Sequence, residues 1–93
     1  MEVIMFTMKG CPHCDNLKKK LTENKISFIE KDVDEHEKIY EKFSKAVKSD
    51  FLPAVIIGKK AFIPDRSFKT IDQGAQLIEN YLREQDHHGH HLG

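Results

Sequence analysis

Cysteine is scarce in this chain, which has only Cys11 and Cys14 among its 93 residues. Two cysteines cannot build a disulfide scaffold, and they cannot supply all the thiolates of a zinc site made of cysteines alone. A metal site would need further ligands, and the body of the chain offers only His13, between the two cysteines, and the isolated His36. The sequence therefore directs attention to the reactivity of the two cysteines themselves.

The chain also lacks a net charge and a long apolar run. Lys+Arg and Asp+Glu both number 15, so there is no overall basic field, and we expect no binding to nucleic acid. The apolar stretch at Val3–Thr7 is too short for a signal-peptide core or a membrane span, so we expect a cytoplasmic protein that does not associate with membranes. The cytosol keeps thiols reduced, and a disulfide formed there is usually transient and catalytic.

The length and the apolar pattern indicate one α/β domain over residues 1–84 and a His-rich, disordered tail over residues 85–93. Strands are predicted at residues 3–7, 26–33, 54–57 and 61–63, and helices at about 12–24, 34–48 and 70–83. The order is β-α-β-α-β-β-α, which predicts a mixed four-stranded sheet with helices on both faces. The first two strands should be parallel, because a helix connects them, and the last two should form a hairpin at Gly58.

Two of the predicted helices begin with a recognisable capping pattern. Asp34 is followed three residues later by Glu37, and Thr70 is followed three residues later by Gln73. Both pairs have the spacing of a capping box. His36 is expected to be an exposed residue of the helix that Asp34 would start.

The motif Cys11-Pro12-His13-Cys14 stands where the first strand runs into the first helix. Pro12 suits the first helical position, since its missing N–H would have no partner there. Cys11 then lies at the helix N-terminus, where backbone N–H groups, the helix dipole and the positive charges of Lys9 and His13 stabilise a thiolate. Cys14 falls on the inward face, so we expect Cys11 to attack a disulfide and Cys14 to resolve the mixed disulfide.

Other interpretations of these residues stay open. The two cysteines could be structural, or half of a metal site. The run 18–20, all lysine, could attract anionic partners or could be an ordinary solvated helix face. The tail histidines could bind a transition metal or could belong to a mobile tail.

With Pro53 ahead of an apolar strand, the Cys11-Pro12-His13-Cys14 motif resembles that of the glutaredoxins, which carry C-P-Y-C at this point and have a thioredoxin-like fold. The resemblance covers about residues 1–84. It implies that Pro53 is cis and lies against the active-site cysteines. It also implies that the backbone of Leu52 pairs with the substrate as an added strand does.

Several positions depart from the glutaredoxin pattern. His13 replaces the usual tyrosine, Met8 stands where the family has a lysine, and Asp50 stands where it often has a basic residue. The Gly-Gly and Asp that bind the γ-glutamyl end of glutathione are missing from the region of residues 63–67. We therefore expect weak glutathione binding. The candidate contacts for substrate or glutathione are Lys9, Leu52, Pro53, Arg66 and Ser67.

Three functions are compatible with these observations. The first is a glutaredoxin-like thiol–disulfide oxidoreductase that reduces protein disulfides or glutathione mixed disulfides and is recharged by glutathione. The second is a thioredoxin-like electron carrier recharged by a flavoprotein reductase of the thioredoxin-reductase type. The third is a metal- or Fe–S-binding module that uses Cys11 with an outside ligand. For the redox functions we expect a monomer without a tightly bound cofactor, whose partners are disulfide-containing proteins.

Overall fold

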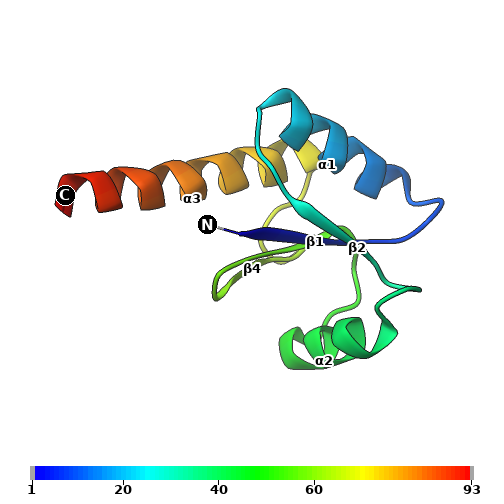
Figure 1. Cartoon of the computed structure of the whole chain (residues 1–93). Helices are drawn as coiled ribbons and strands as arrows, with labels where there is room; N and C mark the ends of the chain where they lie inside the picture. Colours follow the sequence, from blue (N-terminus) through cyan, green and yellow to red (C-terminus); the bar gives the residue numbers. More distant parts are fainter. Residues whose placement is uncertain (1, 93) are drawn as a thin grey trace.

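A computed structural model describes the backbone of residues 2–92 and the side chains of residues 2–85. Within this part of the chain the elements follow the predicted order β-α-β-α-β-β-α (Figure 1). The elements are β1 (Val3–Thr7), α1 (Pro12–Glu23), β2 (Ile29–Asp32), α2 (Glu37–Val47), β3 (Ala54–Ile57), β4 (Lys60–Phe62) and α3 (Ile71–Leu92).

The strands form one mixed sheet in the order β2-β1-β3-β4. β1 is parallel to β2 and antiparallel to β3, with Met5 between Glu30 and Val55. β3 and β4 form the predicted antiparallel hairpin, whose turn holds Gly58 at a φ of +61°. β1 and β3 are the inner strands, which explains why their sequences are almost wholly apolar.

Helices cover both faces of the sheet, as predicted (Figure 1). α1 and α3 lie on one face, where Leu17 and Ile78 pack against Met5 in the larger core. α2 lies on the other face, where Tyr40 and Phe43 pack against Phe6, at ring-centroid distances of 5.4 Å and 5.1 Å. The carboxyl end of β1, immediately before the cysteine motif, therefore lies between the helices on the two faces of the sheet.

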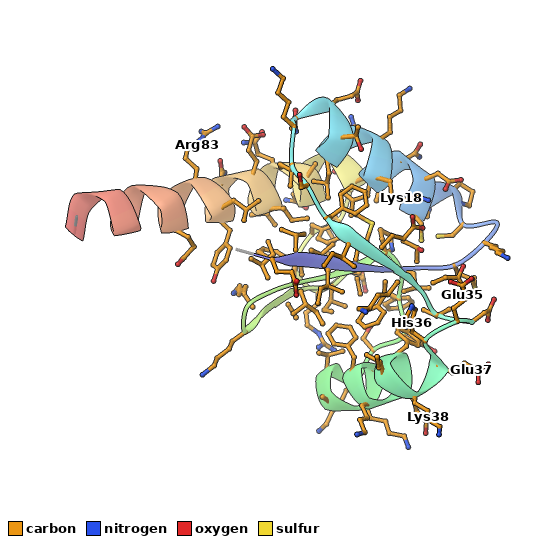
Figure 2. All side chains as sticks on the ribbon, viewed as in Figure 1. Lys18, Glu35, His36, Glu37, Lys38 and Arg83 are labelled. Atoms are coloured by element: carbon orange, nitrogen blue, oxygen red, sulfur yellow. The ribbon has the colours of Figure 1, made fainter. Side chains whose placement is uncertain are left out.

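The capping prediction is correct for α3 and wrong for α2. Thr70 Oγ1 accepts a hydrogen bond from the backbone N–H of Gln73 at 3.1 Å. In α2 the N-cap is His36, without a side-chain cap bond, and Figure 2 shows His36 where the chain enters the helix. Asp34 is instead held in the preceding turn, because Asp32 Oδ1 accepts its backbone N–H at 2.8 Å. The competing Asp32 turn moves the helix start two residues along the chain.

Two strands also differ from their predicted ranges. β2 spans four residues, not residues 26–33, because only Ile4 to Thr7 of β1 lie opposite it. Ile26 and Phe28 pack instead against the larger core from the connection between α1 and β2. β4 ends at Phe62, because the backbone N–H of Ile63 bonds to Ser67 Oγ at 3.0 Å rather than to a strand.

The third helix is longer than the sequence pattern predicts. Its backbone continues to Leu92, whereas the apolar spacing ends near residue 83. Arg83 pairs with Glu79 at 2.6 Å one turn earlier, which supports the helix where the apolar stripe stops. The side chains of residues 86–93 lie outside the described part of the chain, so the mobility of the tail stays a prediction. Among the described residues, no helix has the length and apolar character that a membrane span needs.

Gly74 permits a close approach between α3 and the loop before it. A Cβ at this position would lie 2.9 Å from the ring of the buried Phe68. We therefore expect Gly74→Ala to lower the free energy of unfolding by about 1 kcal/mol, since overpacking costs about 1–3 kcal/mol and the gain in helix propensity is about 1 kcal/mol. Urea unfolding measures the change, and Gly74→Ala should cost less in a Phe68→Leu background than in the wild type, since the smaller side chain leaves room for the Cβ. A more stable Gly74→Ala would contradict the packing argument.

Candidate active site

Cys11 occupies the N-cap position of α1, as predicted. Its backbone is extended, with φ −98° and ψ 104°, and Pro12 is the first helical residue. Gly10, with a φ of +77°, turns the chain from β1 into this position. The Cys11 sulfur accepts the backbone N–H of Cys14 at 3.3 Å, so a free helix-end donor points at the sulfur. This is a setting that stabilises negative charge.

Cys14 lies one turn further along α1 and is completely buried, whereas Cys11 is half-buried. Both are free thiols, and the Cys14 thiol donates to the Cys11 sulfur over 2.7 Å. Burial, followed by the hydrogen bond with Cys11, raises the pKa of Cys14 to about 12. Cys14 therefore remains a protonated donor at neutral pH, and Cys11 is the sulfur that a substrate can reach.

Alkylation should distinguish the two sulfurs. With a pKa of about 12 and no exposed surface, Cys14 has almost no thiolate at pH 6 to 9. We expect iodoacetamide to label Cys11 almost exclusively near pH 6, and the label can be located by peptide mass spectrometry. Cys14→Ser should still be labelled and Cys11→Ser should not. Labelling mainly at Cys14 would reverse the assignment of the nucleophile.

The Leu52–Pro53 peptide bond is cis, which confirms the prediction from the family resemblance. Pro53 is fully buried, and it shares the wall of a groove of about 450 Å³ with His13 of α1. The groove thus joins the cysteine motif to the segment ahead of β3. Packing of Pro53 against the two sulfurs themselves stays a prediction. The groove is lined mainly by apolar residues, among them Phe51, Leu52, Pro53, Pro64, Phe68 and Ile71.

Lys9 and His13 flank the cysteines as the sequence predicts. Lys9 is exposed in the turn that leads to Cys11. His13 is exposed and lies against the groove. Their roles in stabilising a thiolate or contacting a substrate stay predictions.

Arg66 and Ser67 hold other parts of the chain together. The Arg66 guanidinium donates to the carbonyl of Val47, and also to that of Lys48 at 3.3 Å, at the C-terminus of α2. Ser67 Oγ accepts the backbone N–H of Ile63 at 3.0 Å. Both side chains are therefore engaged within the protein, and a contact of either with glutathione stays a prediction.

The lysines at residues 18–20 are partly neutralised by ion pairs that the sequence did not reveal. Lys18 bonds to Glu30 of β2 at 3.0 Å, and Lys20 pairs with Asp72 of α3 at 2.5 Å. Figure 2 shows Lys18 projecting from α1. This arrangement favours the interpretation of the run as a helix face over that of a free cationic patch.

A polar network at the end of β1 was also missed by sequence reasoning. The buried Thr7 hydroxyl donates to Glu30 Oε2 at 2.7 Å, and Lys18 donates to the same oxygen. The bonds from Thr7 and Lys18 hold the pKa of Glu30 below its usual value. The network ties β1, β2 and α1 together just before the cysteine motif. In the sequence, the only sign of this network is a threonine, Thr7, at the end of an apolar strand.

Phe51 is the other residue whose position only the structure reveals. Its side chain is 56% exposed and forms part of the groove wall next to Leu52 and Pro53.

In the described part of the chain, no group of three or more His, Cys, Asp and Glu side chains is arranged to hold a metal ion. The binding of a metal by Cys11 together with a ligand from outside the chain stays a prediction.

The fold and the site define a class: a thioredoxin-like α/β protein with a C-x-x-C dithiol at a helix N-terminus and a cis-proline ahead of β3. The sequence model of the glutaredoxin family, described simply as Glutaredoxin, matches residues 3–63. The match covers well over half of the chain and includes both cysteines and Pro53. The chain therefore belongs to the glutaredoxin family.

Solved structures support the fold assignment. NrdH-redoxin from Escherichia coli, described as glutaredoxin-like with a thioredoxin-like activity profile, is 23% identical, with a TM-score of 0.64 over 78% of this chain and 93% of its own. A mutant of the thioredoxin-like protein BC3987 is 21% identical, with a TM-score of 0.66 over 83% and 99%. Glutaredoxin from Brucella melitensis is 21% identical, with a TM-score of 0.62 over 86% and 80%. No curated protein sequence matches the chain.

Proposed function

We propose that this protein is a thiol–disulfide oxidoreductase that reduces protein disulfides or glutathione mixed disulfides through a Cys11/Cys14 dithiol–disulfide cycle. The observation that carries the proposal is the pair of free sulfurs 2.7 Å apart, one half-buried at a helix N-terminus and one fully buried. Membership of the glutaredoxin family supports the same chemistry.

In the first step the Cys11 thiolate attacks a substrate disulfide. The substrate S–S bond breaks, a mixed disulfide forms, and the first substrate thiolate leaves and takes up a proton. The N-cap position and the bond from the Cys14 N–H favour the thiolate in this step. Cys14, protonated and buried, does not compete for the substrate.

In the second step Cys14 loses its proton and attacks the Cys11 sulfur of the mixed disulfide. The Cys11–Cys14 disulfide forms, the second substrate thiol leaves, and the protein has given up two electrons. Part of the raised pKa of Cys14 is due to its hydrogen bond with Cys11 and to the charge of Cys11. Both causes disappear once Cys11 is bound in a mixed disulfide, so substrate attack itself favours deprotonation of Cys14.

The surroundings of the groove favour a flavoprotein reductase over glutathione as the electron donor. Arg66 is engaged with the α2 carbonyls, and Lys69 is paired with Asp65 at 3.1 Å, so two cations near the groove are already bonded within the protein. This favours a thioredoxin-like carrier that a flavoprotein reductase recharges. The thioredoxin-like activity profile printed for the NrdH-redoxin from Escherichia coli is in keeping with this alternative.

Recharging of the oxidised protein separates the two donor systems. The Cys11–Cys14 disulfide is prepared with an oxidant and incubated either with glutathione, glutathione reductase and NADPH, or with thioredoxin reductase and NADPH. Return of free thiols in the first mixture supports the glutaredoxin-like function, and return only in the second supports the carrier. A protein that neither system nor dithiothreitol can reduce would refute the redox cycle.

Asp50 provides a test of the expected weak binding of glutathione. It is exposed and lies beside Phe51 and Arg66 on the rim of the neighbouring pocket. If a glycyl carboxylate of glutathione binds there, Asp50 repels it. We expect Asp50→Arg to lower the KM for a glutathionylated peptide about fivefold, since exposed pairs contribute up to about 1 kcal/mol.

Glu2→Arg is the matched control, because it changes the charge equally and precedes β1 at the end of the sheet remote from Cys11. Its KM should equal that of the wild type. A low wild-type KM that Asp50→Arg leaves unchanged would show that Asp50 does not weaken glutathione binding.

The proposal also includes the place of action and the partners. The protein acts in the cytoplasm as a monomer, and its partners are disulfide-containing proteins together with either glutathione or a thioredoxin-reductase-type flavoprotein. Glutathione acts as a reductant or co-substrate and not as a tightly bound cofactor. The dithiol supplies all the electrons of one turnover.

A further inference from the structure

Phe51 is an exposed aromatic side chain in the groove that His13 of the cysteine motif also lines. Its exposed fraction of 56% is the highest among the large apolar residues in the described part of the chain. Ile39, at 51%, lies on α2 and does not contribute to the groove, whereas Phe51 lines the groove together with His13 and Pro53. An exposed aromatic inside a concave site is typical of a binding surface rather than of a scattered surface residue.

The groove around Phe51 is suited to an uncharged ligand. Phe51, Pro64 and Phe68 provide apolar surface, and the volume of about 450 Å³ is in the range of small-molecule pockets, about 300–1,000 Å³. Lys69, the lysine of this groove, bonds to the carbonyl and the carboxylate of Asp65 at 3.0 Å and 3.1 Å. The groove lining therefore carries one lysine and one carboxylate, whose charges cancel, so it offers a charged ligand no net attraction.

The reaction determines what passes through the groove. A substrate sulfur must reach Cys11, and His13, two residues further along the same helix, lies in the groove wall. The groove wall therefore begins two residues from Cys11, so a substrate chain bonded to Cys11 has this wall within reach. In an extended segment each residue advances the chain by about 3.3 Å, so a side chain one or two residues from the substrate cysteine can enter the groove that Phe51 lines.

The segment that leads into Phe51 is anchored by hydrogen bonds at two points. Its backbone N–H donates to Ser49 Oγ at 3.3 Å. Arg66 fixes the end of α2 through the carbonyls of Val47 and Lys48, just before this segment. A wall that is already ordered loses little conformational freedom on binding.

From these observations we propose that Phe51 is a specificity-determining residue, and that the groove selects protein disulfides with an apolar side chain one or two residues from the reacting cysteine. The proposal rests on the oxidoreductase function proposed above and names its substrate class. No new chemistry is involved, because the dithiol supplies the two electrons and the substrate disulfide receives them.

The test uses single turnovers of the pre-reduced protein, so that no external electron donor is needed. The substrates are homodimeric disulfides of one short peptide, with either leucine or serine next to the cysteine. Bis(2-hydroxyethyl) disulfide, which has no flanking residues, reports on the oxidoreductase chemistry alone. The proteins are wild type, Phe51→Ser, Phe51→Leu, and Ile39→Ser as the matched change of an exposed apolar residue outside the groove.

We expect wild type and Ile39→Ser to react about tenfold faster with the leucine peptide than with the serine peptide, which corresponds to about 1.4 kcal/mol. Phe51→Ser should bring this ratio close to one, and Phe51→Leu should keep most of it. Because each variant is judged by the ratio of its rates with the leucine and serine peptides, a general loss of activity leaves this ratio unchanged.

A wild-type ratio near one, or a ratio that Phe51→Ser leaves unchanged, would overturn the proposed selectivity while the reduction of bis(2-hydroxyethyl) disulfide still supports the oxidoreductase. If wild type reduced none of the three disulfides, the oxidoreductase function and the selectivity would both be refuted.

Discussion

Cys11→Ser is expected to abolish reduction of every disulfide substrate, with a loss on the order of a thousandfold or more. The serine hydroxyl is not ionised at neutral pH and does not attack sulfur as a thiolate does. Cys14, left intact, cannot replace it, because it is completely buried, and this burial, the largest cause of its raised pKa, remains in the variant. The rates are measured in single turnovers with bis(2-hydroxyethyl) disulfide and with a peptide disulfide.

The exchange of sulfur for oxygen at a half-buried N-cap should leave the fold intact, since serine is itself a favourable N-cap residue. Circular dichroism and thermal unfolding of Cys11→Ser serve as the control. A well-folded Cys11→Ser that retains a tenth or more of the wild-type rate would show that Cys11 is not the nucleophile.

Cys14→Ser is expected to have the second largest effect, which should depend on the substrate. On protein disulfides the variant should stop at the mixed disulfide, because resolution within the chain needs the second thiol. The trapped species can be counted by non-reducing electrophoresis and mass spectrometry. On glutathionylated substrates, free glutathione can resolve the intermediate from outside, so part of the activity should remain.

Burial of a hydroxyl at residue 14 can itself cost about 1–3 kcal/mol, because Cys14 is completely buried. Cys14→Ala, which adds no polar group, is the second variant and should trap the same mixed disulfides. Full wild-type activity of both variants on protein disulfides would refute the two-cysteine cycle.

The two variants together also bear on the choice between the proposed donors. A protein that works mainly on protein disulfides needs Cys14 for every turnover, whereas a glutathione-dependent enzyme can work with Cys11 alone. The activity that Cys14→Ser retains on glutathionylated substrates, as a fraction of the wild-type activity, therefore measures how well this chain uses glutathione. The groove, in which the cation of Lys69 is paired with Asp65, favours a low fraction.

Local sequence patterns predicted the placement of the two cysteines well. Proline at the second position of the motif, after an apolar strand, placed Cys11 at a helix N-cap, and helical spacing placed Cys14 on the buried face. These features depend on backbone preferences and on the 3.6-residue period of a helix, which act over a few residues. The order of the elements, the parallel pair of β1 and β2 and the hairpin of β3 and β4 were predictable from the same kind of pattern, aided by the rule for crossover connections, whereas the antiparallel pairing of β1 with β3 was not predicted. The cis bond at Pro53 came from the family resemblance alone.

The start of α2 shows where local patterns were insufficient. Asp34 has the spacing of a cap, but Asp32 captures its backbone N–H, and the helix begins after His36. The outcome depends on how the end of β2 is held against β1, where the backbone N–H of Val33 bonds to the carbonyl of Thr7 at 2.8 Å. Neighbouring residues alone do not specify this.

The arrangement of the two sulfurs, an accessible cysteine at a helix end and a buried one behind it, could be predicted from the residues of one short motif. The surroundings of these sulfurs became known only from the packing of the chain. Arg66 bonds to carbonyls 18 and 19 residues earlier in the chain, and Phe51 and His13 line the same groove. Contacts between segments so far apart depend on how the layers pack, whereas a helix cap depends on the few residues around it. The positions of the two sulfurs can therefore be predicted from a short motif, and the lining of the groove cannot.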